Sequence, residues 1–355
     1  MEPVPDSLRP VGPWLAARLP GAETVELLGI RRASSGFSAD TVMLDTLVTH
    51  GGVATEERYV LRTESPEPPI YPVQVPGWPV EIELQYRVME ALARHSRVPV
   101  APMLGYEPDT GVLGTQFFVM GFVDGQVPVE DPPYTTAGFF LDVAPTDRRR
   151  MIEAGLGTLA RVHEVDWRTA GLEWLVPPGP TPGLPTQLAL WEEYARTELR
   201  DRVHPLVDRA FAWLHAERPT VSPVGLCWGD PRPGNIIWSD CTPACVTDFE
   251  AASIAPPELD LGWWLMFDRT MHEGAGVGRP DGDPTRAEQL QMYEAASGRT
   301  VPDVRWFEIC AATRYCAIVV RVMNRAVDRG VMPEDHTIWL ENPATTALEG
   351  LLAET

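Results

Sequence analysis

The first third of the chain alternates hydrophobic and polar residues in short runs, which is the pattern of β-strands with one buried face. Such runs cover residues 25–30, 41–44, 59–62 and 115–120. Between the last two, apolar residues recur at helical spacing over residues 81–95, and Pro99 follows the end of that helix. The pattern predicts an antiparallel sheet with one helix packed against it.

The rest of the chain repeats its apolar residues with the period of α-helices. The predicted helices cover residues 148–164, 186–197, 204–217, 257–271, 285–296, 302–328 and 337–352. Residues 273–284 are rich in Gly and Asp, and we predict a mobile loop there. The order of strands first and helices afterwards predicts an α+β fold with two lobes.

A polar loop lies between two strand-like runs in residues 226–238. Its sequence, Asp230-Pro-Arg-Pro-Gly-Asn235, is followed by a predicted turn at residues 239–240 and then by Asp248. Asp-x4-Asn followed by a second Asp is the order of the kinase catalytic loop and metal strand, in which the first Asp accepts the hydroxyl proton and the other two residues bind Mg²⁺. The alternative is a surface loop that uses Asp and Asn for its turns. The flanking strands favour the kinase interpretation.

Three segments together resemble one known family. Trp228-Gly-Asp-x-Arg-x-Gly-Asn-Ile-Ile, Thr247-Asp-Phe-Glu and Pro257-Glu-Leu-Asp-Leu-Gly are similar to motifs of the aminoglycoside phosphotransferase family, also called the choline-kinase-like group. Within it, the chain resembles an actinobacterial branch of small-molecule kinases, from about residue 27 to the end.

The resemblance implies a two-lobed protein-kinase-like fold. Its N-lobe, residues 1–125, would carry the phosphate loop and hinge, and its helical C-lobe, residues 126–355, the catalytic loop and acceptor site. It also implies an ATP- and Mg²⁺-dependent phosphotransferase that acts on a hydroxyl of a small molecule, either aminoglycoside-like or another hydroxylated metabolite. Within that group, hydroxyacyl-CoA-type compounds are an alternative acceptor class.

The resemblance also implies roles for residues of the C-lobe motifs. The catalytic residues would be Asp230, with Arg232 in the same loop and Asp260 bracing that loop; alternatively Asp260 is a helix N-cap. The implied metal ligands are Asn235, Asp248 and Glu250, although Glu250 could equally be a surface residue. Trp228 replaces the usual His, and with one donor and no acceptor it is expected to act by packing.

In the N-lobe, the first hairpin carries small residues where a kinase phosphate loop belongs. The candidates are Ser34, Ser35, Gly36 and Ser38, and an ordinary turn is the alternative. The third strand carries Arg62 in place of the usual Lys, and a guanidinium also binds phosphate and carboxylate. We expect its acidic partner to be Glu83, with Glu81 second, although Gln85 is a candidate for the family's Glu position. The predicted hinge contacts to adenine are Met120, Gly121 and Val123.

The chain has a formal net charge of −21, which argues against nucleic acid as a partner. Such a charge favours a cationic acceptor, or it serves solubility alone. Candidates for an acidic acceptor site are Glu250, Glu258, Asp268 and Glu273. Trp263, Trp264, Phe267 and Met271 form an apolar stripe on one predicted helix, which is either core or part of an apolar acceptor site.

Other features bound the interpretation. No apolar run is long enough to cross a membrane, and the start of the chain lacks a signal peptide pattern, so we expect a cytoplasmic protein. The five Cys do not form zinc-ligand pairs, and His163 lies on an amphipathic helix, where a structural role is expected. The replacements at Trp228 and Arg62, and the unsettled assignment of Glu83 as acidic partner, leave one competing class open, a non-catalytic nucleotide-binding pseudokinase scaffold.

Overall fold

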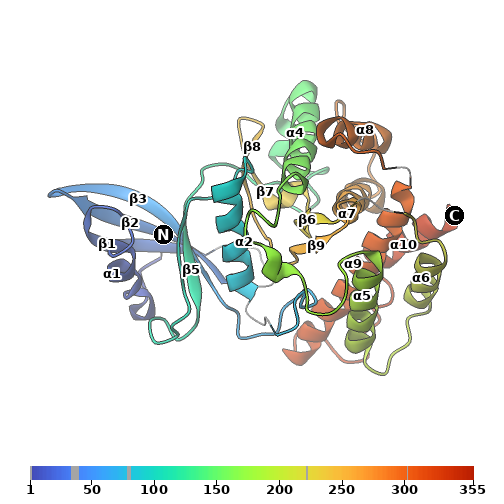
Figure 1. Cartoon of the computed structure of the whole chain (residues 1–355), viewed down its shortest axis with the longest axis horizontal. Helices are drawn as coiled ribbons and strands as arrows, with labels where there is room; N and C mark the ends of the chain where they lie inside the picture. Colours follow the sequence, from blue (N-terminus) through green and yellow to red (C-terminus); the bar gives the residue numbers. More distant parts are fainter. Residues whose placement is uncertain (1, 33–39, 78–80, 221–222, 302) are drawn as a thin grey trace.

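The computed structural model describes residues 2–32, 40–77, 81–220, 223–301 and 303–355. Its N-terminal part is a five-stranded antiparallel sheet in the order β1-β2-β3-β5-β4 (Figure 1). The strands are β1 (Ala22–Arg32), β2 (Asp40–His50), β3 (Val53–Thr63), β4 (Met103–Glu107) and β5 (Phe117–Gly121). The sheet predicted from the alternating pattern is therefore present, and β4 is an additional strand that the sequence did not indicate.

The two faces of this sheet belong to different hydrophobic cores, because successive strand residues point to opposite sides. Leu61 and Val119 pack on the side of α1 (Val11–Ala16). Val60 and Phe118 point to the other side, where α2 (Glu81–His95) lies and the core continues into the helical part. The helix predicted over residues 81–95 thus has the predicted bounds, and it connects the sheet to the rest of the molecule.

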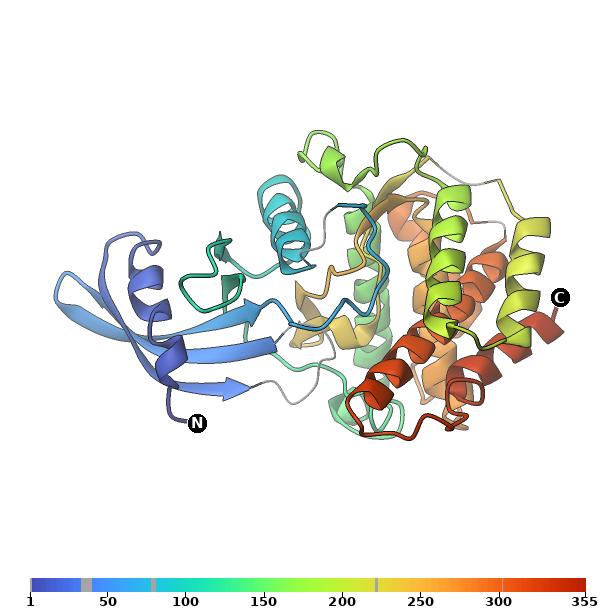
Figure 2. The same cartoon turned by 90° about the horizontal axis from the view of Figure 1, so that it is seen from below.

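The C-terminal part is mostly helical and contains two small strand pairs (Figures 1 and 2). Its α-helices are α3 (Phe139–Asp142), α4 (Pro145–His163), α5 (Leu184–Leu199), α6 (Pro205–Ala216), α7 (Glu258–Arg269), α8 (Arg286–Ser297), α9 (Val304–Asp328) and α10 (Pro343–Ala353). The strand pairs are β6 (Gly225–Cys227) with β9 (Ser253–Ala255), and β7 (Ile236–Ser239) with β8 (Thr242–Val246). Short helical turns cover Asp6–Leu8, Glu173–Leu175 and Pro233–Asn235, and a π-helical turn, Thr270–Gly274, continues α7.

Helix α9 runs through the helical part and packs against α5, α6, α7 and α10. It approaches α7 closely at Gly262, where a Cβ would lie 2.4 Å from the carbonyl carbon of Phe307. The predicted helix over residues 337–352 instead begins at Pro343, because Asn342 caps it by accepting the N–H groups of Ala344 and Thr345. None of the described helices has the length and hydropathy needed to span a bilayer.

Candidate active site

The loop predicted to be catalytic, residues 228–235, follows β6 and holds Asp230 in a tight turn; it is called the catalytic loop below. Gly229, just before it, has φ +96°, and a Cβ there would lie 2.3 Å from the carbonyl oxygen of Ala251, so only glycine fits. Asp230 is 4% exposed. Its oxygen Oδ2 accepts hydrogen bonds from Asn235 Nδ2 at 2.8 Å and Arg232 Nε at 3.1 Å, both from the same loop. The motif residues therefore meet at one carboxylate.

Two further donors reach Asp230 from distant parts of the chain. Trp263 of α7 donates its indole N–H to Oδ1 at 2.6 Å, and the Tyr71 hydroxyl donates to Oδ2 at 2.9 Å. Burial, and next the negative charge of Asp230, raise the pKa of Tyr71 well above its usual value, so the phenol is neutral. Neither contact was predicted, since Trp263 was known only as a member of an apolar stripe and Tyr71 lies outside every motif.

Arg232 connects Asp230 to Glu130, with which its Nη1 forms an ion pair. Burial alone would lower the pKa of Arg232, but the charges of Asp230 and Glu130 raise it overall. Burial raises the pKa of Glu130, and Arg232 offsets part of that shift. The guanidinium also lies over the Phe267 ring, 5.0 Å from its centroid. Glu130 is a site residue that the sequence did not single out, because it lies in a loop without a recognisable motif.

Asp260 holds the backbone of the catalytic loop. Its two oxygens accept the N–H groups of Trp228 at 2.6 Å and Gly229 at 3.0 Å. It does not cap α7, whose N-cap residue is Pro257. His163 lies 3.1 Å from Asp260 Oδ2 through Nε2 and 2.8 Å from the Tyr293 hydroxyl through Nδ1. The bracing contact expected of Asp260 is present, and His163 is a satisfied buried histidine, as predicted.

Trp228, which stands in place of the histidine of the motif that the sequence resembles, is fully buried. Its ring stacks on Phe249 with centroids 5.6 Å apart, and its indole N–H donates to the Thr247 carbonyl at 2.7 Å. The expected packing role agrees with these contacts. The residue also ties the catalytic loop to the strand end that carries Asp248.

Asp248 lies beyond β8 with φ +57°, a left-handed conformation that Asp tolerates better than most residues. Arg62 Nη1 donates to Asp248 Oδ1 at 2.7 Å, and Arg62 Nη2 lies 3.5 Å from Glu250 Oε1. Thr247, the residue before Asp248, donates its N–H to the Asn235 carbonyl at 3.0 Å. The implied metal ligands Asn235 and Asp248 are thus joined through the backbone. Glu250 is 9% exposed, which excludes the surface alternative.

The predicted pair of Arg62 with Glu83 is wrong. Arg62 Nη1 donates instead to Gln85 Oε1 at 2.9 Å, while Glu83 lies 3.8 Å from Arg87 Nη1, one helical turn away. Positions 81 and 85 are four residues apart and share a face of α2, whereas position 83 points elsewhere. Gln85 therefore occupies the place of the acidic partner, and the negative charge comes from other residues.

Glu81, the second choice, contributes to the surroundings of Arg62. Burial and the nearby Glu64 raise the pKa of Glu81 to about 7, although Arg62 and a hydrogen bond with Glu250 act in the opposite direction. Burial alone would lower the pKa of Arg62, but Asp248 and Glu250 raise it overall. Within the part of the chain that the structure describes, Arg62 Nε is buried without a hydrogen-bond partner. A buried donor of this kind fits an anionic group supplied by a ligand.

The other N-lobe candidates belong to the predicted phosphate loop and the predicted hinge. Ser34, Ser35, Gly36 and Ser38 lie outside the described residues. Met120 and Gly121 end strand β5, and Gly121 donates its N–H to the Pro102 carbonyl at 2.8 Å. That bond occupies the Gly121 donor, so Val123 remains as the predicted donor to adenine.

Three of the four acidic residues predicted to line an acceptor site are buried or paired with arginines. Glu258 is buried at the start of α7, Asp268 is paired with Arg279, and Glu273 is paired with Arg269. The surroundings of Asp230 on this side are aromatic instead. The ring centroids of Trp263 and Phe267 are 5.3 Å apart, those of Trp263 and Tyr315 6.3 Å, and those of Phe267 and Tyr315 5.0 Å.

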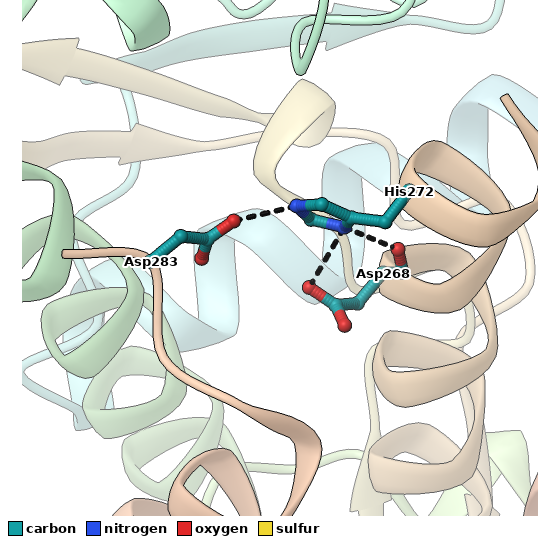
Figure 3. A group of neighbouring side chains, drawn as sticks. All are labelled: Asp268, His272 and Asp283. Atoms are coloured by element: carbon teal, nitrogen blue, oxygen red, sulfur yellow. Dashed lines mark hydrogen bonds and ion pairs between the residues drawn. The ribbon is translucent and has the colours of Figure 1, made fainter. Parts of the chain in front are cut away.

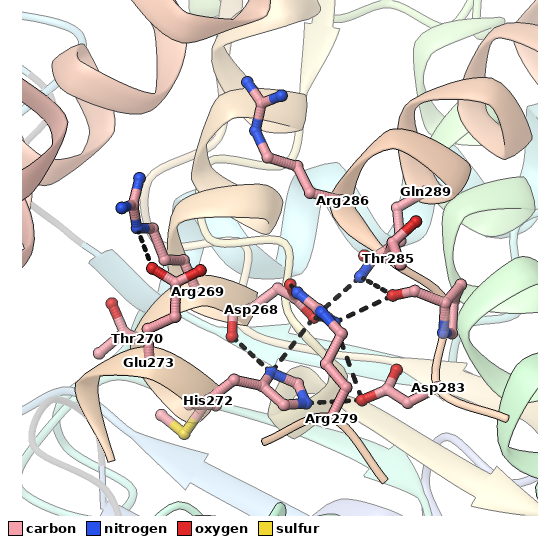
Figure 4. Close-up of polar contacts among 12 residues, drawn as sticks. Asp268, Arg269, Thr270, His272, Glu273, Arg279, Asp283, Thr285, Arg286 and Gln289 are labelled. Carbon is pink, nitrogen blue, oxygen red and sulfur yellow. Dashed lines mark hydrogen bonds and ion pairs between the residues drawn. The ribbon is translucent and has the colours of Figure 1, made fainter. Parts of the chain in front are cut away.

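A second polar cluster lies at the C-terminal end of α7 and contains Asp268, His272 and Asp283 (Figure 3). His272 Nε2 lies 2.6 Å from Asp283 Oδ2, and its Nδ1 lies 2.7 Å from the Asp268 carbonyl. Figure 4 shows Arg279 against the same carboxylates, with both terminal nitrogens bonded to Asp268. The segment 273–284, predicted as a mobile loop, is thus fastened to α7.

The composition of this cluster is that of a metal site, but its charges argue for a structural role. Both oxygens of Asp268 already accept hydrogen bonds, from Arg279 and from Gln289 Nε2 at 2.9 Å. The guanidinium neutralises one of the two carboxylates, and a protonated His272 neutralises the other. A divalent ion would leave excess positive charge in a buried place. We therefore interpret the cluster as an ion-pair lock between α7 and the following loop.

The lock predicts a pH dependence of stability. Burial lowers the pKa of His272, but the hydrogen bond that its ring donates to Asp283 and the charge of Asp268 outweigh burial and raise that pKa above its usual value. The protonated ring therefore stabilises the folded state fully below about pH 6.5, and this stabilisation is lost as the pH rises through the folded pKa. As the pH rises from about 6 to 8.5, the urea concentration at the unfolding midpoint should fall in wild type and should fall less in His272→Gln. The exposed His215→Gln is the matched control, and equal declines in all three proteins would contradict the lock.

Comparison with known proteins agrees with this geometry. The model of the phosphotransferase enzyme family (APH) matches residues 29–307. Among curated proteins, the chain is 29% identical over 260 residues to acyl-CoA dehydrogenase family member 11 of Gallus gallus, covering 72% of this chain and 30% of that protein. For the Homo sapiens protein of the same name, the identity is 26% over 342 residues, covering 93% and 40%. The chain spans less than half the length of these relatives.

Solved structures similar to this chain include proteins described as phosphotransferases and kinases. A protein from Ralstonia eutropha, provisionally described as an aminoglycoside phosphotransferase, superposes with a TM-score of 0.67 at 22% identity, covering 96% of this chain and 94% of that one. Macrolide 2'-phosphotransferase MphH of Brachybacterium faecium gives 0.57 at 17% identity, covering 97% and 98%. Ethanolamine kinase of Plasmodium vivax gives 0.55 at 11%, covering 92% and 82%. These similarities confirm the predicted kinase-like fold.

Proposed function

Because this chain belongs to the phosphotransferase enzyme family, we propose that it transfers the γ-phosphoryl group of ATP to a hydroxyl of a small molecule, with Mg²⁺ as the metal. The observation that supports this most is the backbone link between the catalytic loop and the metal strand, Thr247 N–H to Asn235 O at 3.0 Å. It keeps Asp230, Asn235 and Asp248 in one site. Residues 1–125 are proposed to hold the nucleotide and residues 126–355 the acceptor.

In the proposed reaction, Asp230 receives the proton of the acceptor hydroxyl as a new oxygen–phosphorus bond forms. The bond between the γ-phosphorus and the β,γ-bridging oxygen breaks, and ADP leaves. Trp263 and Asn235 hold the Asp230 carboxylate by hydrogen bonds to different oxygens. The orientation of the base is therefore fixed before the acceptor arrives, which is the contribution that positioning makes to phosphoryl transfer.

The residues present fit Mg²⁺, which prefers oxygen ligands. Asp248 offers a carboxylate, and Asn235 uses its amide nitrogen on Asp230, which leaves the amide oxygen for a metal. Bound Mg²⁺ would neutralise charge on the phosphate oxygens. Arg62 contacts Asp248 and has a buried Nε without a partner among the described residues, so we assign it to the nucleotide phosphates.

The surroundings of Asp230 support an acceptor with an apolar part. Trp263, Phe267 and Tyr315 pack together beside the base. Of the acidic residues expected for a polycation, Asp268 and Glu273 are paired with arginines, and Glu258 is buried. We therefore favour hydroxylated apolar metabolites over aminoglycosides. The names of the longer curated relatives keep hydroxyacyl-CoA-type compounds among the candidates.

The proposal predicts that ATP binding requires Mg²⁺ and Asp248. ATP at about 100 times its Kd should stabilise the wild-type protein by about 2.7 kcal/mol, seen as a rise in Tm, only when Mg²⁺ is present. Asp248→Ala should lose this rise, while Asp240→Ala, a change in the exposed β7–β8 turn, should keep it. A rise independent of Mg²⁺, or no rise at all, would support the non-catalytic scaffold instead.

A further inference from the structure

The connection between β3 and α2, residues 64–77, leaves the sheet and crosses to the C-terminal helices before it returns (Figure 2). We call it the strap. Its base is closed by Glu64, whose carboxylate accepts the N–H groups of Glu81 at 3.3 Å and Ile82 at 3.0 Å at the start of α2. The strap is therefore a loop with adjoining ends and a tip that reaches the other lobe, and compact loops of this kind are frequently functional.

The tip of the strap is fastened to α9 and α5. Arg329, the residue that follows α9, forms two bonds of 2.8 Å with the Glu67 carboxylate. Arg321 donates to the carbonyls of Pro68 at 3.1 Å and Pro69 at 3.2 Å. On α5, the Tyr194 hydroxyl donates to the Ile70 carbonyl, and Ile70 itself is buried. These contacts hold the residue that follows, Tyr71, over the catalytic loop.

Tyr71 has the position and chemistry of an acceptor alcohol. Its hydroxyl donates to Asp230 Oδ2 at 2.9 Å, which is the bond that an alcohol makes before it loses its proton to a base. The same oxygen already accepts from Asn235 and Arg232, so three donors share an atom with two lone pairs. Those two donors belong to the loop of Asp230 itself, whereas Tyr71 comes from the strap. Tyr71 is therefore the donor whose removal costs the site least.

The burial of Asp230 also indicates that an acceptor must displace Tyr71. Asp230 is only 4% exposed with Tyr71 in place, yet a base must contact the acceptor whose proton it receives. This inference rests on the proposed function: we propose that Tyr71 is an internal stand-in for the acceptor. Its hydroxyl occupies Asp230 in the free protein, and the hydroxyl of an incoming acceptor displaces it. The strap then selects alcohols that displace the phenol, and it keeps water from the base until they do.

Tyr71→Phe tests the stand-in because it removes only the hydroxyl. In the absence of an acceptor, Tyr71→Phe should hydrolyse Mg-ATP about three- to tenfold faster than wild type. Water would reach Asp230 without first breaking the hydrogen bond from the Tyr71 hydroxyl, and one hydrogen bond has an effect of this size. The acceptor KM should fall by a similar factor with kcat retained. Arg321→Gln, which loosens the strap, should change hydrolysis in the same direction. Tyr86→Phe, which removes a hydroxyl that contacts Glu90 on α2, is the matched control and should leave hydrolysis unchanged.

The outcomes separate this inference from the proposed function. Hydrolysis that depends on Asp230 but is equal or lower in Tyr71→Phe would overturn the stand-in alone. A tenfold or larger fall in kcat at unchanged KM would make Tyr71 a positioning residue for the base, which also overturns it. If no protein, including Tyr71→Phe and Asp230→Asn, hydrolyses or transfers phosphate from Mg-ATP, the proposed function fails and the stand-in with it.

Discussion

Asp230→Asn is expected to lower kcat for phosphoryl transfer by about 10²–10⁴-fold, the usual contribution of a positioned general base. The amide cannot take the hydroxyl proton, whereas the bonds from the Trp228 and Gly229 N–H groups to Asp260 are left in place. ATP affinity should change little, because Arg62 and Asp248 are assigned to the nucleotide. Steady-state kinetics with both substrates varied would measure the two effects separately.

Asp240→Asn is the matched control for this substitution. Asp240 is exposed in the turn between β7 and β8, and asparagine tolerates its φ of +48°. The control should keep wild-type kcat. An Asp230→Asn protein with circular dichroism and kcat like those of wild type would show that the base lies elsewhere.

Asp260→Ala is expected to reduce the free energy of unfolding by about 2–6 kcal/mol, because two buried N–H groups lose their acceptor. These are the N–H groups of Trp228 and Gly229, and His163 loses a partner as well. Activity should fall too, since the loop that carries Asp230 is no longer held. Urea unfolding, together with kcat measured well below the midpoint, would give both effects.

Asp260→Asn separates bracing from charge, because it keeps one acceptor oxygen and should lose less stability than the alanine variant. His163→Gln removes the outer partner without touching the loop and should be milder still. If Asp260→Ala unfolds at the wild-type midpoint, the bracing account is wrong.

Local patterns in the sequence predicted most of the fold. The helix over residues 81–95 has the predicted bounds because its apolar positions keep one period throughout. The β7–β8 hairpin also follows from a short turn between apolar runs. The five-residue strand β4 was missed because it follows a proline-rich stretch, and five residues give too few alternations to register as a strand.

The predicted site was complete only where its residues are close in sequence. Asp230, Arg232 and Asn235 lie in one loop, so their spacing alone brings them together. Tyr71 and Glu130 reach the site from separate loops, and such contacts between distant segments leave no periodic or spacing signal. The sequence signal that could have suggested Tyr71 is an aromatic hydroxyl in the connection before α2.

The acidic acceptor site was predicted from the net charge of the chain, which does not determine where individual carboxylates lie. The net charge of −21 says nothing about which carboxylates are paired. Asp268 forms its lock with Arg279, and Glu273 pairs with Arg269, because helical spacing and loop closure bring those groups together. The apolar stripe of α7 was predicted to be either core or part of an acceptor site, and its residues divide between the two. Trp264 donates to Gln289 in the core, while Trp263 donates to Asp230.

The transfer of a phosphoryl group tests the central claim most directly. Wild type and Asp230→Asn are each incubated with Mg-ATP and one mixture of alcohols, from apolar hydroxyacyl compounds to amino sugars, and the mass of every component is followed. We predict that one or more alcohols gain a phosphoryl group only with wild type, with one ADP formed for each. Equal product from both proteins, or Mg-dependent ATP binding by wild type without product or ADP, would contradict the proposed phosphotransferase.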